Sequence, residues 1–167
     1  MKDQITKIKN NIEKVVINAG VGKLSSKAHF KDKILPEITE QISKITGQKP
    51  TPTKSRKSIA GFDVREGDTV GLKTTLRGKR MADFIIKINS IAFPRLRDFK
   101  GIDLKNIDKN GNLNLGFKDQ SVFPEINMDK VKNDFGFQVN IVPKEKERVE
   151  AIKIYREIGI PLKKSKE

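Results

Sequence analysis

Segments that alternate like β-strands occur in groups along this chain, and segments with helical spacing separate the groups. Apolar and polar side chains alternate over 113–117 and again over 137–141, as in strands with one buried face. Helices placed between groups of strands predict an α+β fold with a largely antiparallel sheet, in preference to a doubly wound fold. The most regular apolar stripe with helical spacing comprises Met81, Phe84, Ile85, Ile88 and Ala92.

The first third of the chain predicts one strand and one helix. The run 12–17 is rich in β-branched residues and is expected to end at a tight loop that contains two glycines. Ser25 or Ser26 is expected to cap a helix that ends at Gly47. Pro36 lies inside this helix and predicts either a kink or two helical segments.

The remainder of the chain predicts a β-hairpin followed by further helices and strands. Residues 50–76 combine β-branched residues with glycine-containing turns, which indicates a hairpin with a long tip. The next helix is expected to end at Pro94, and the last helix to run from about 144 to 158. The inward face of that last helix is expected to comprise Val149, Ile152 and Tyr155.

The length of 167 residues is that of one ordinary domain. We expect residues 1–167 to form a single domain, with 1–11 as a short N-terminal extension and 163–167 as a basic tail. The sequence contains no internal repeat and no low-complexity linker.

Positive charge gathers in the middle of the chain. Thirteen Lys and Arg residues lie between Lys49 and Lys100, against five acidic residues, and the whole chain has a formal net charge of +14. Each Lys or Arg that approaches a phosphate releases a condensed counterion, so a basic cluster of this kind is typical of proteins that bind nucleic acid.

The segment 54–62 is the strongest candidate for a binding loop within this cluster. A run of charge is usually only a solvated face, but this one falls at the expected hairpin tip and includes two large apolar residues, Ile59 and Phe62. Apolar side chains gain nothing from exposure to water, so their presence favours a contact with a partner.

Several other functions are excluded by the residues present. The chain has no cysteine, and its one histidine, His29, has no second His or Cys to share a metal. The segment G-V-G-K at 20–23 lacks the glycine spacing of a phosphate-binding loop. Asp98, Asp103 and Asp108 could be magnesium ligands, but interleaved Lys and Arg residues make solvated charges the simpler interpretation. We therefore expect no catalytic residue, metal or cofactor.

Composition also bears on the environment and on the kind of nucleic acid. No run approaches the roughly 20 apolar residues of a membrane span, and docking on anionic lipid is disfavoured because the helices resemble core-facing ones, so a cytoplasmic location without membrane binding is expected. The chain has no Trp, one Tyr and no RNP1-type aromatic motif. Recognition through phosphate, ribose and shape, which suits folded double-helical RNA, is therefore expected.

Six ordered blocks of the sequence closely resemble the bacterial ribosomal protein L-five family. The likeness extends from about Ile12 to Leu162. The blocks are V-I-N-A-G-V-G (16–22), I-T-G-Q-K-P (45–50), K-S-I-A-G-F (57–62), T-L-R-G (75–78), P-R-L-R-D-F-K-G (94–101) and F-P-E-I (123–126).

The resemblance implies a constituent of the large ribosomal subunit that binds 5S rRNA in the central protuberance. The implied neighbours are 23S rRNA, the 5S-binding protein L-eighteen, P-site tRNA and the small-subunit head protein S-thirteen. The implied fold is an antiparallel sheet with helices packed on one face and a long basic hairpin loop. A free-standing RNA-binding chaperone or assembly factor is the alternative, and an RNA-processing enzyme lacks the catalytic groups that it would need.

The resemblance also implies roles for individual residues. The residues that match the family's 5S rRNA contacts are Asn18, Gln48 and Thr75. Contacts with the rRNA backbone are expected from Lys49, Arg77, Arg95 and Arg97. The loop that approaches tRNA is expected to use Lys54, Arg56, Lys57, Ser58, Ile59, Gly61 and Phe62. Asp63 follows this loop where the family pattern suggests Lys, which predicts a weaker pull on tRNA phosphate.

Overall fold

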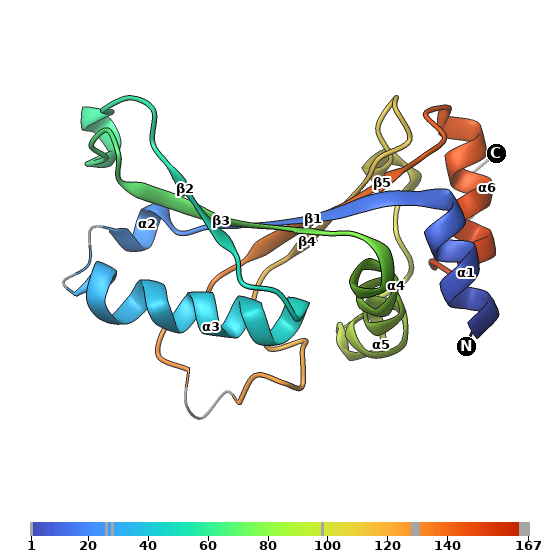
Figure 1. Ribbon diagram of the computed structural model, residues 1–167, viewed down its shortest axis with the longest axis horizontal. Coiled ribbons are helices and arrows are strands. Elements are labelled where there is room, and N and C mark those ends of the chain that lie inside the picture. Colours follow the sequence, from blue (N-terminus) through green and yellow to red (C-terminus); the bar gives the residue numbers. More distant parts are fainter. Residues whose placement is uncertain (1, 26, 28, 98, 128–130, 164–167) are drawn as a thin grey trace. The chain divides into compact units, whose positions relative to one another are not determined.

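The computed structural model of the chain describes residues 2–25, 27, 29–97, 99–127 and 131–163 (Figure 1). Its strands are β1 (Ile12–Gly20), β2 (Thr51–Lys54), β3 (Thr69–Leu76), β4 (Leu113–Phe117) and β5 (Phe137–Pro143). Its α-helices are α1 (Lys2–Asn11), α2 (Gly22–Ser25), α3 (Leu35–Thr46), α4 (Gly78–Lys87), α5 (Phe93–Arg95) and α6 (Arg148–Ile158). The π-helical segments are η1 (Phe30–Ile34) and η3 (Ile88–Ala92), and the 3-10 helices are η2 (Ala60–Phe62) and η4 (Leu104–Asn106).

The strands form one five-stranded antiparallel sheet in the order β2-β3-β1-β5-β4. The predicted α+β class with a largely antiparallel sheet is therefore confirmed. β1 continues beyond the expected end at Ile17, because the alternation of buried side chains persists through Ala19 before the chain leaves the sheet.

The chain divides into two compact units. Unit 1 comprises 1–16, 75–115 and 139–167, and unit 2 comprises 17–74 and 116–138. β1, β3, β4 and β5 each contribute residues to both units. The expectation of a single domain stays a prediction.

In unit 2, α3 packs an apolar face and ends in an ordinary glycine cap. The face consists of Ile38, Ile42 and Ile45, which are 3% exposed or less. Gly47 takes the left-handed conformation at the end of the helix, as expected, and its N–H donates to the Ser43 carbonyl at 2.8 Å.

The start of this helical region agrees with the prediction at Pro36 but not at the cap. The helix divides into η1 and α3, which is one of the two expected outcomes, and Pro36 lies in the first turn of α3, where its missing N–H costs nothing. Ser25 does not cap it: the Ser25 hydroxyl donates back to the Gly22 carbonyl at 2.6 Å within α2. Ser26, the alternative cap, lies outside the described residues.

The other part of unit 2 is organised around a cluster of phenylalanines and one buried amide. The rings of Phe117, Phe123, Phe135 and Phe137 lie with centroids 5.1 to 6.3 Å apart. Gln120 is completely buried beside them. Its Oε1 accepts the Phe135 N–H at 3.1 Å and its Nε2 donates to the Asn133 carbonyl at 3.2 Å, so the two ends of the long 118–135 loop are joined through one side chain.

In unit 1, the expected apolar stripe is buried, but the helical region is longer than predicted. Met81, Phe84, Ile85, Ile88 and Ala92 are all 2% exposed or less. Helical structure continues from α4 through η3 into α5, which includes Pro94. The prediction that this proline ends the helix was wrong, because it occupies the first turn of α5, where no N–H donor is needed.

The N-terminal residues form a helix that the sequence analysis did not predict. α1 contacts α4 and α6 within unit 1, and its Ile8 is fully buried. The Gln4 side chain donates to the Ile158 carbonyl at the end of α6, at 3.3 Å. Ile5, Ile8 and Ile12 recur at helical spacing, and this pattern was the available signal.

In unit 1, hydrogen bonds from one tyrosine join a tight turn to the last helix. The predicted turn at Asn110-Gly111 is present, with Gly111 at φ 76°. The hydroxyl of the fully buried Tyr155 lies 2.8 Å from the Gly111 carbonyl and 3.1 Å from that of Ile141. Burial raises the pKa of this phenol well above its usual value, so the hydroxyl remains a donor.

The predicted inward face of α6 is only partly right. Tyr155 is buried, but Val149 is 57% exposed, and Ile152 is half-buried. The helix begins at Arg148 rather than at 144, and its buried residues are Ala151, Tyr155 and Ile158. Ala151 faces the Gly111 turn, and its small side chain allows α6 to approach this turn closely. This close contact, rather than the size of the apolar side chains, determines which face of α6 is buried.

Candidate nucleic-acid interface

β2 and β3 form the predicted hairpin, and a register shift marks the base of its loop. Thr53 pairs with Gly71 and Lys54 with Thr69, so Val70 is an extra residue on β3. The carbonyl of Val70 accepts the Val21 N–H at 3.0 Å, next to the end of β1. The bulge therefore joins the returning strand of the hairpin to the segment that enters α2.

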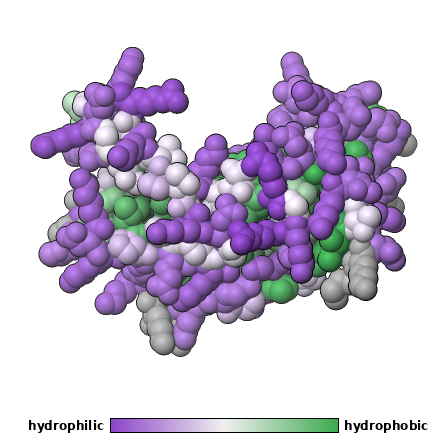
Figure 2. Space-filling view, in the orientation of Figure 1, coloured by the Kyte–Doolittle hydropathy of each residue, from purple (hydrophilic) through white to green (hydrophobic). Residues whose placement is uncertain are grey.

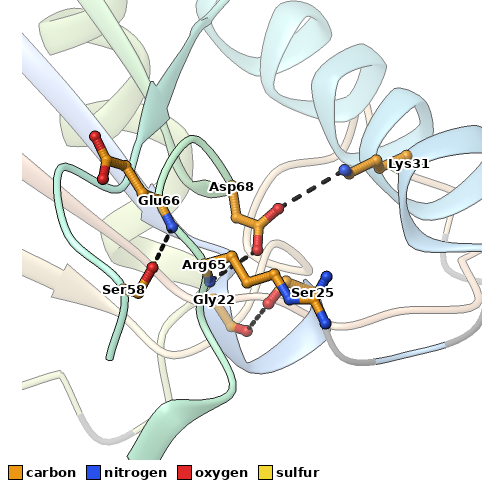
Figure 3. A network of polar contacts seen from close by, with 7 residues as sticks. All are labelled: Gly22, Ser25, Lys31, Ser58, Arg65, Glu66 and Asp68. Carbon is orange, nitrogen blue, oxygen red and sulfur yellow. Dashed lines mark hydrogen bonds and ion pairs between the residues drawn. The ribbon is translucent and has the colours of Figure 1, made fainter. Parts of the chain in front are cut away.

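Beyond the bulge, hydrogen bonds between the two sides order the loop. Ser55 N–H donates to the Asp68 carbonyl at 2.8 Å, and Gly67 N–H donates to the Ser55 carbonyl at 3.0 Å. Nearer the tip, the Glu66 N–H donates to the Ser58 hydroxyl at 3.0 Å, as drawn in Figure 3. Ile59 and Val64 exchange backbone hydrogen bonds of 2.8 and 3.3 Å. The loop is thus a paired structure almost to its tip.

The basic side chains of this loop point to solvent. Lys54, Arg56 and Lys57 are exposed, and none of them is paired with a carboxylate of the residues that the structure describes. Figure 2 shows hydrophilic side chains projecting from the hairpin at the upper left of the view. Exposed cations without a carboxylate partner are available to neutralise phosphates and release their counterions, so the loop is suited to bind a polyanion.

The other predicted loop residues lie at the same tip. Ser58 and Gly61 are exposed, and Ile59 is 49% exposed although it is apolar. Phe62 ends the 3-10 helix η2, but its side chain lies outside what the structure describes. Arg65, which was not among the predicted residues, is exposed on the returning side of the loop; its place after the predicted tip was the only signal.

Asp63 has a structural reason to differ from a lysine. It adopts φ 50° and ψ 32°, the left-handed conformation, and its N–H donates to the Ala60 carbonyl at 3.2 Å. Asp and Asn enter this conformation more readily than longer side chains. The acidic residue therefore fits the turn, although its charge opposes an approaching phosphate.

The three residues that match the family's 5S rRNA contacts are all partly exposed. Asn18 lies in β1 and Gln48 just after α3, both in unit 2, whereas Thr75 lies in β3 and belongs to unit 1. β1 and β3 are neighbouring strands of the sheet. The structure therefore places Asn18 and Thr75 on adjacent strands and Gln48 on a helix end.

The position of Gln48 is fixed by the residue two before it. The Thr46 hydroxyl is buried and lies 2.8 Å from the Gln48 carbonyl, and the Gln48 N–H donates to that hydroxyl at 3.3 Å. Together with the glycine cap at Gly47, this bond turns the chain sharply as it leaves α3. The Gln48 side chain is thereby carried on a rigid backbone.

The four residues expected to contact the rRNA backbone are exposed, and they are spread over both units. Lys49 lies in unit 2, next to Gln48. Arg77 precedes α4, Arg95 ends α5 and Arg97 follows it, all in unit 1. The sequence therefore identified accessible cations, but they belong to different parts of the chain.

The acidic residues considered as metal ligands have other roles. The hydrogen bond from Lys163, at 2.9 Å, holds the pKa of Asp103 below its usual value. Burial alone would raise the pKa of Asp108, but hydrogen bonds from Asn112 and Asn110 lower it, and these bonds shape the turn. Asp98 lies outside the described residues. Within the part of the chain that the structure describes, no His, Cys, Asp or Glu cluster could hold a metal ion.

A cavity among the described residues of unit 2 is lined mainly by polar side chains that pair with one another. It has a volume of about 310 Å³ and is lined by Glu37, Glu40, Gln41, Lys44, Glu125, Ile126, Asn127 and Val131. In it, Glu40 is paired with Lys44 at 2.7 Å, and Glu37 accepts hydrogen bonds from Gln41 and Asn133. Separately, the described helices include none that is long and apolar enough to cross a membrane.

Comparison with known proteins extends over nearly the whole chain. Residues 9–65 match the family described as Ribosomal protein L5, and residues 69–162 match the model of the C-terminus of the same ribosomal family. The large ribosomal subunit protein uL5 of Malacoplasma penetrans is 46% identical over 93% of this chain and 81% of its own length. The protein of the same name from Acholeplasma laidlawii is 44% identical over 92% of this chain and 83% of its own length. The chain belongs to the ribosomal protein L5 family.

Proposed function

We propose that this chain binds 5S rRNA in the central protuberance of the large ribosomal subunit, and contacts P-site tRNA and the small-subunit head. As a member of its family it is a ribosomal structural protein of the large subunit and not an enzyme. The proposal includes 23S rRNA and proteins L-eighteen and S-thirteen as neighbours, in ribosomes of the cytoplasm.

One observation carries the 5S rRNA part of the proposal. In a chain with a net charge of +14, the three side chains that the resemblance assigns to 5S rRNA are uncharged, hydrogen-bonding and partly exposed. Such groups suit ribose hydroxyls and base edges, whereas cations close to them in the sequence, such as Lys49 and Arg77, supply attraction to phosphate. This division of roles supports binding to a folded RNA of defined shape.

The exposed basic loop supports the tRNA part of the proposal. It combines unpaired cations with the exposed apolar Ile59, and it is ordered by its own hydrogen bonds. An ordered loop loses less conformational entropy on binding than a flexible one. The loop can therefore offer charge and shape to a second RNA while the sheet residues engage the first.

The 5S rRNA assignment predicts a loss of affinity for three single variants. Asn18→Ala, Gln48→Ala and Thr75→Ala should each weaken binding to 5S rRNA by about 1 to 3 kcal/mol, because an RNA polar group loses its partner in a partly dried interface. Filter binding or calorimetry with purified 5S rRNA measures this. Asn10→Ala, which removes an exposed amide from α1, is the control and should bind like the parent. Normal binding by all three variants would contradict the assignment.

The tRNA assignment predicts a separable defect. Arg56→Ala with Lys57→Ala should leave 5S binding and assembly into large subunits unchanged but weaken retention of P-site tRNA. If both cations contact phosphate, the salt dependence of tRNA retention should fall by roughly 1.4 to 1.8 in the log–log slope. The matched control is Lys7→Ala with Lys9→Ala, which removes the same charge from the exposed side of α1.

Two results would change this assignment. Loss of 5S binding with intact tRNA retention would place the basic loop on 5S rRNA. Failure of the chain to co-sediment with intact large subunits would instead favour a free-standing chaperone or assembly factor.

A further inference from the structure

Asp68 is an acidic residue at the base of a loop whose other exposed charges are mostly positive. Its carboxylate faces two donors, which Figure 3 draws together: Oδ2 accepts the Arg65 N–H at 3.0 Å, and Oδ1 lies 3.7 Å from the Lys31 ammonium. Its backbone also contributes, since the Asp68 N–H donates to the Arg65 carbonyl at 3.1 Å and its carbonyl accepts from Ser55. Asp68 therefore makes contacts on both sides of the hairpin base.

Charge alone gives no reason for a carboxylate at this position. A negative charge beside Lys54, Arg56 and Arg65 repels phosphate and reduces the attraction that the loop provides. A loop selected only for positive charge would have a neutral or basic residue here. The role of the Asp68 carboxylate therefore depends on the groups that it contacts.

Of the two contacts, the one with the backbone does more to shape the loop. The Lys31 side chain is 76% exposed and its ammonium is 3.7 Å from the carboxylate, and ion pairs of this kind contribute little. The Arg65 N–H bond has a normal length and a charged acceptor, and it closes the turn from Arg65 to Asp68 together with the backbone bond from the Asp68 N–H to the Arg65 carbonyl. Gly67, at φ 86°, completes that turn.

The turn is connected to both sides of the loop. Within it, the Glu66 N–H donates to the Ser58 hydroxyl near the tip, and the Gly67 N–H donates to the Ser55 carbonyl at the base. If the turn opened, both donors would move away from their partners. The direction of Arg56 and Lys57, which lie between Ser55 and Ser58, would then no longer be fixed.

We propose that Asp68 is a positioning residue that holds the basic loop in its tRNA-binding conformation, by accepting the Arg65 N–H and closing the turn between them. This inference rests on the proposed contact between the loop and tRNA. Its action on the loop itself is a property of the free protein and can be measured without RNA.

Two substitutions at Asp68 separate positioning from charge. Both Asp68→Asn and Asp68→Ala remove one negative charge, so electrostatics alone predicts that both variants retain tRNA more tightly. The Asn side chain keeps an oxygen that can accept the Arg65 N–H, whereas Ala keeps none. Positioning therefore predicts that Asp68→Asn retains tRNA at least as well as the parent and that Asp68→Ala retains it about threefold to fivefold less well, the factor expected from loss of one such bond.

The free protein supplies the second measurement. In Asp68→Ala, amide exchange at Arg65, Glu66 and Gly67 should accelerate about fivefold or more, and trypsin should cleave faster after Arg56 and Lys57. Asp68→Asn should resemble the parent in both assays. Asp83→Ala, which removes an exposed acid from α4, is the charge control and should change neither.

The outcomes distinguish this inference from the function on which it rests. Unchanged exchange in Asp68→Ala, or tighter tRNA retention by both Asp68 variants, would overturn the positioning role. Faster exchange in Asp68→Ala with unaltered tRNA retention would support the positioning of the loop but contradict the proposed tRNA contact.

Discussion

Gly111→Ala is expected to lower the free energy of unfolding by about 3 to 5 kcal/mol, because the new methyl group meets both steric and backbone strain. A Cβ at this position would lie 2.8 Å from the Ala151 Cβ, 3.3 Å from the Pro143 side chain and 3.4 Å from the Glu145 carbonyl. The residue also has φ 76°, which L-amino acids with a side chain rarely adopt. None of these three groups is the free end of a flexible side chain, so the turn or α6 would have to move.

Urea unfolding followed by circular dichroism measures this loss. Gly116→Ala is the matched control, because a Cβ at Gly116 meets nothing within 4 Å and its φ is ordinary. The control should differ from the parent by less than about 0.5 kcal/mol. A loss below about 1 kcal/mol for Gly111→Ala would show that the turn moves away from α6 at little cost.

Gln120→Leu is expected to destabilise the protein by about 2 to 5 kcal/mol, although leucine fills a similar volume. The substitution leaves the buried Phe135 N–H without its acceptor and the Asn133 carbonyl without its donor. The unsatisfied buried Phe135 N–H costs about 1 to 3 kcal/mol, and the part-buried Asn133 carbonyl adds a smaller cost. The loss should be local to the 118–135 loop before it is global, because both bonds join the ends of that loop.

Two measurements test this expectation. The midpoint of urea unfolding should fall, and amide exchange at Phe135 should accelerate more than exchange at Tyr155, which lies in the other unit. Gln138→Leu is the control: Gln138 is exposed in β5, so the same chemical change should have an effect within about 0.5 kcal/mol. Equal effects of the two substitutions would show that the buried amide bonds contribute nothing.

The strands and the long helix could be predicted because their signals are local. The alternation in β4 and β5 and the stripe from Met81 to Ala92 each report one buried face, and side-chain period alone determines that face. Pro94 was misread for a local reason as well. A proline inside a helical pattern can break a helix or begin a segment of one, and the pattern does not distinguish a helix interior from a first turn.

The burial of α6 could not be predicted in the same way. Val149 looks like a core residue by hydropathy, but the buried side of the helix is determined by Gly111, whose lack of a side chain allows small Ala151 to approach. That contact joins residues 40 positions apart in the chain, and no local window contains both. Gln120 was missed for the same reason, since its partners lie 13 and 15 residues away.

The candidate site also has one part that local sequence patterns predict and another part that depends on contacts in the folded chain. The basic loop could be predicted because cations and apolar residues coincide at a turn. Asp68 could not, because its importance depends on which backbone N–H its carboxylate faces. The three residues assigned to 5S rRNA came from the family resemblance, and no periodicity or charge pattern would have selected them.

The extra residue at Val70 limits where the length of the hairpin can vary. Side chains alternate faces along β3, so one residue inserted or deleted between Val70 and Leu76 would turn buried Leu72 toward solvent and exposed Lys73 inward. An insertion at the tip, between Ala60 and Asp63, leaves that alternation and the pairing of Ile59 with Val64 intact, and a longer loop costs little additional closure entropy. The reach of the loop can therefore change at its tip, whereas the strands that carry the loop must keep their number of residues.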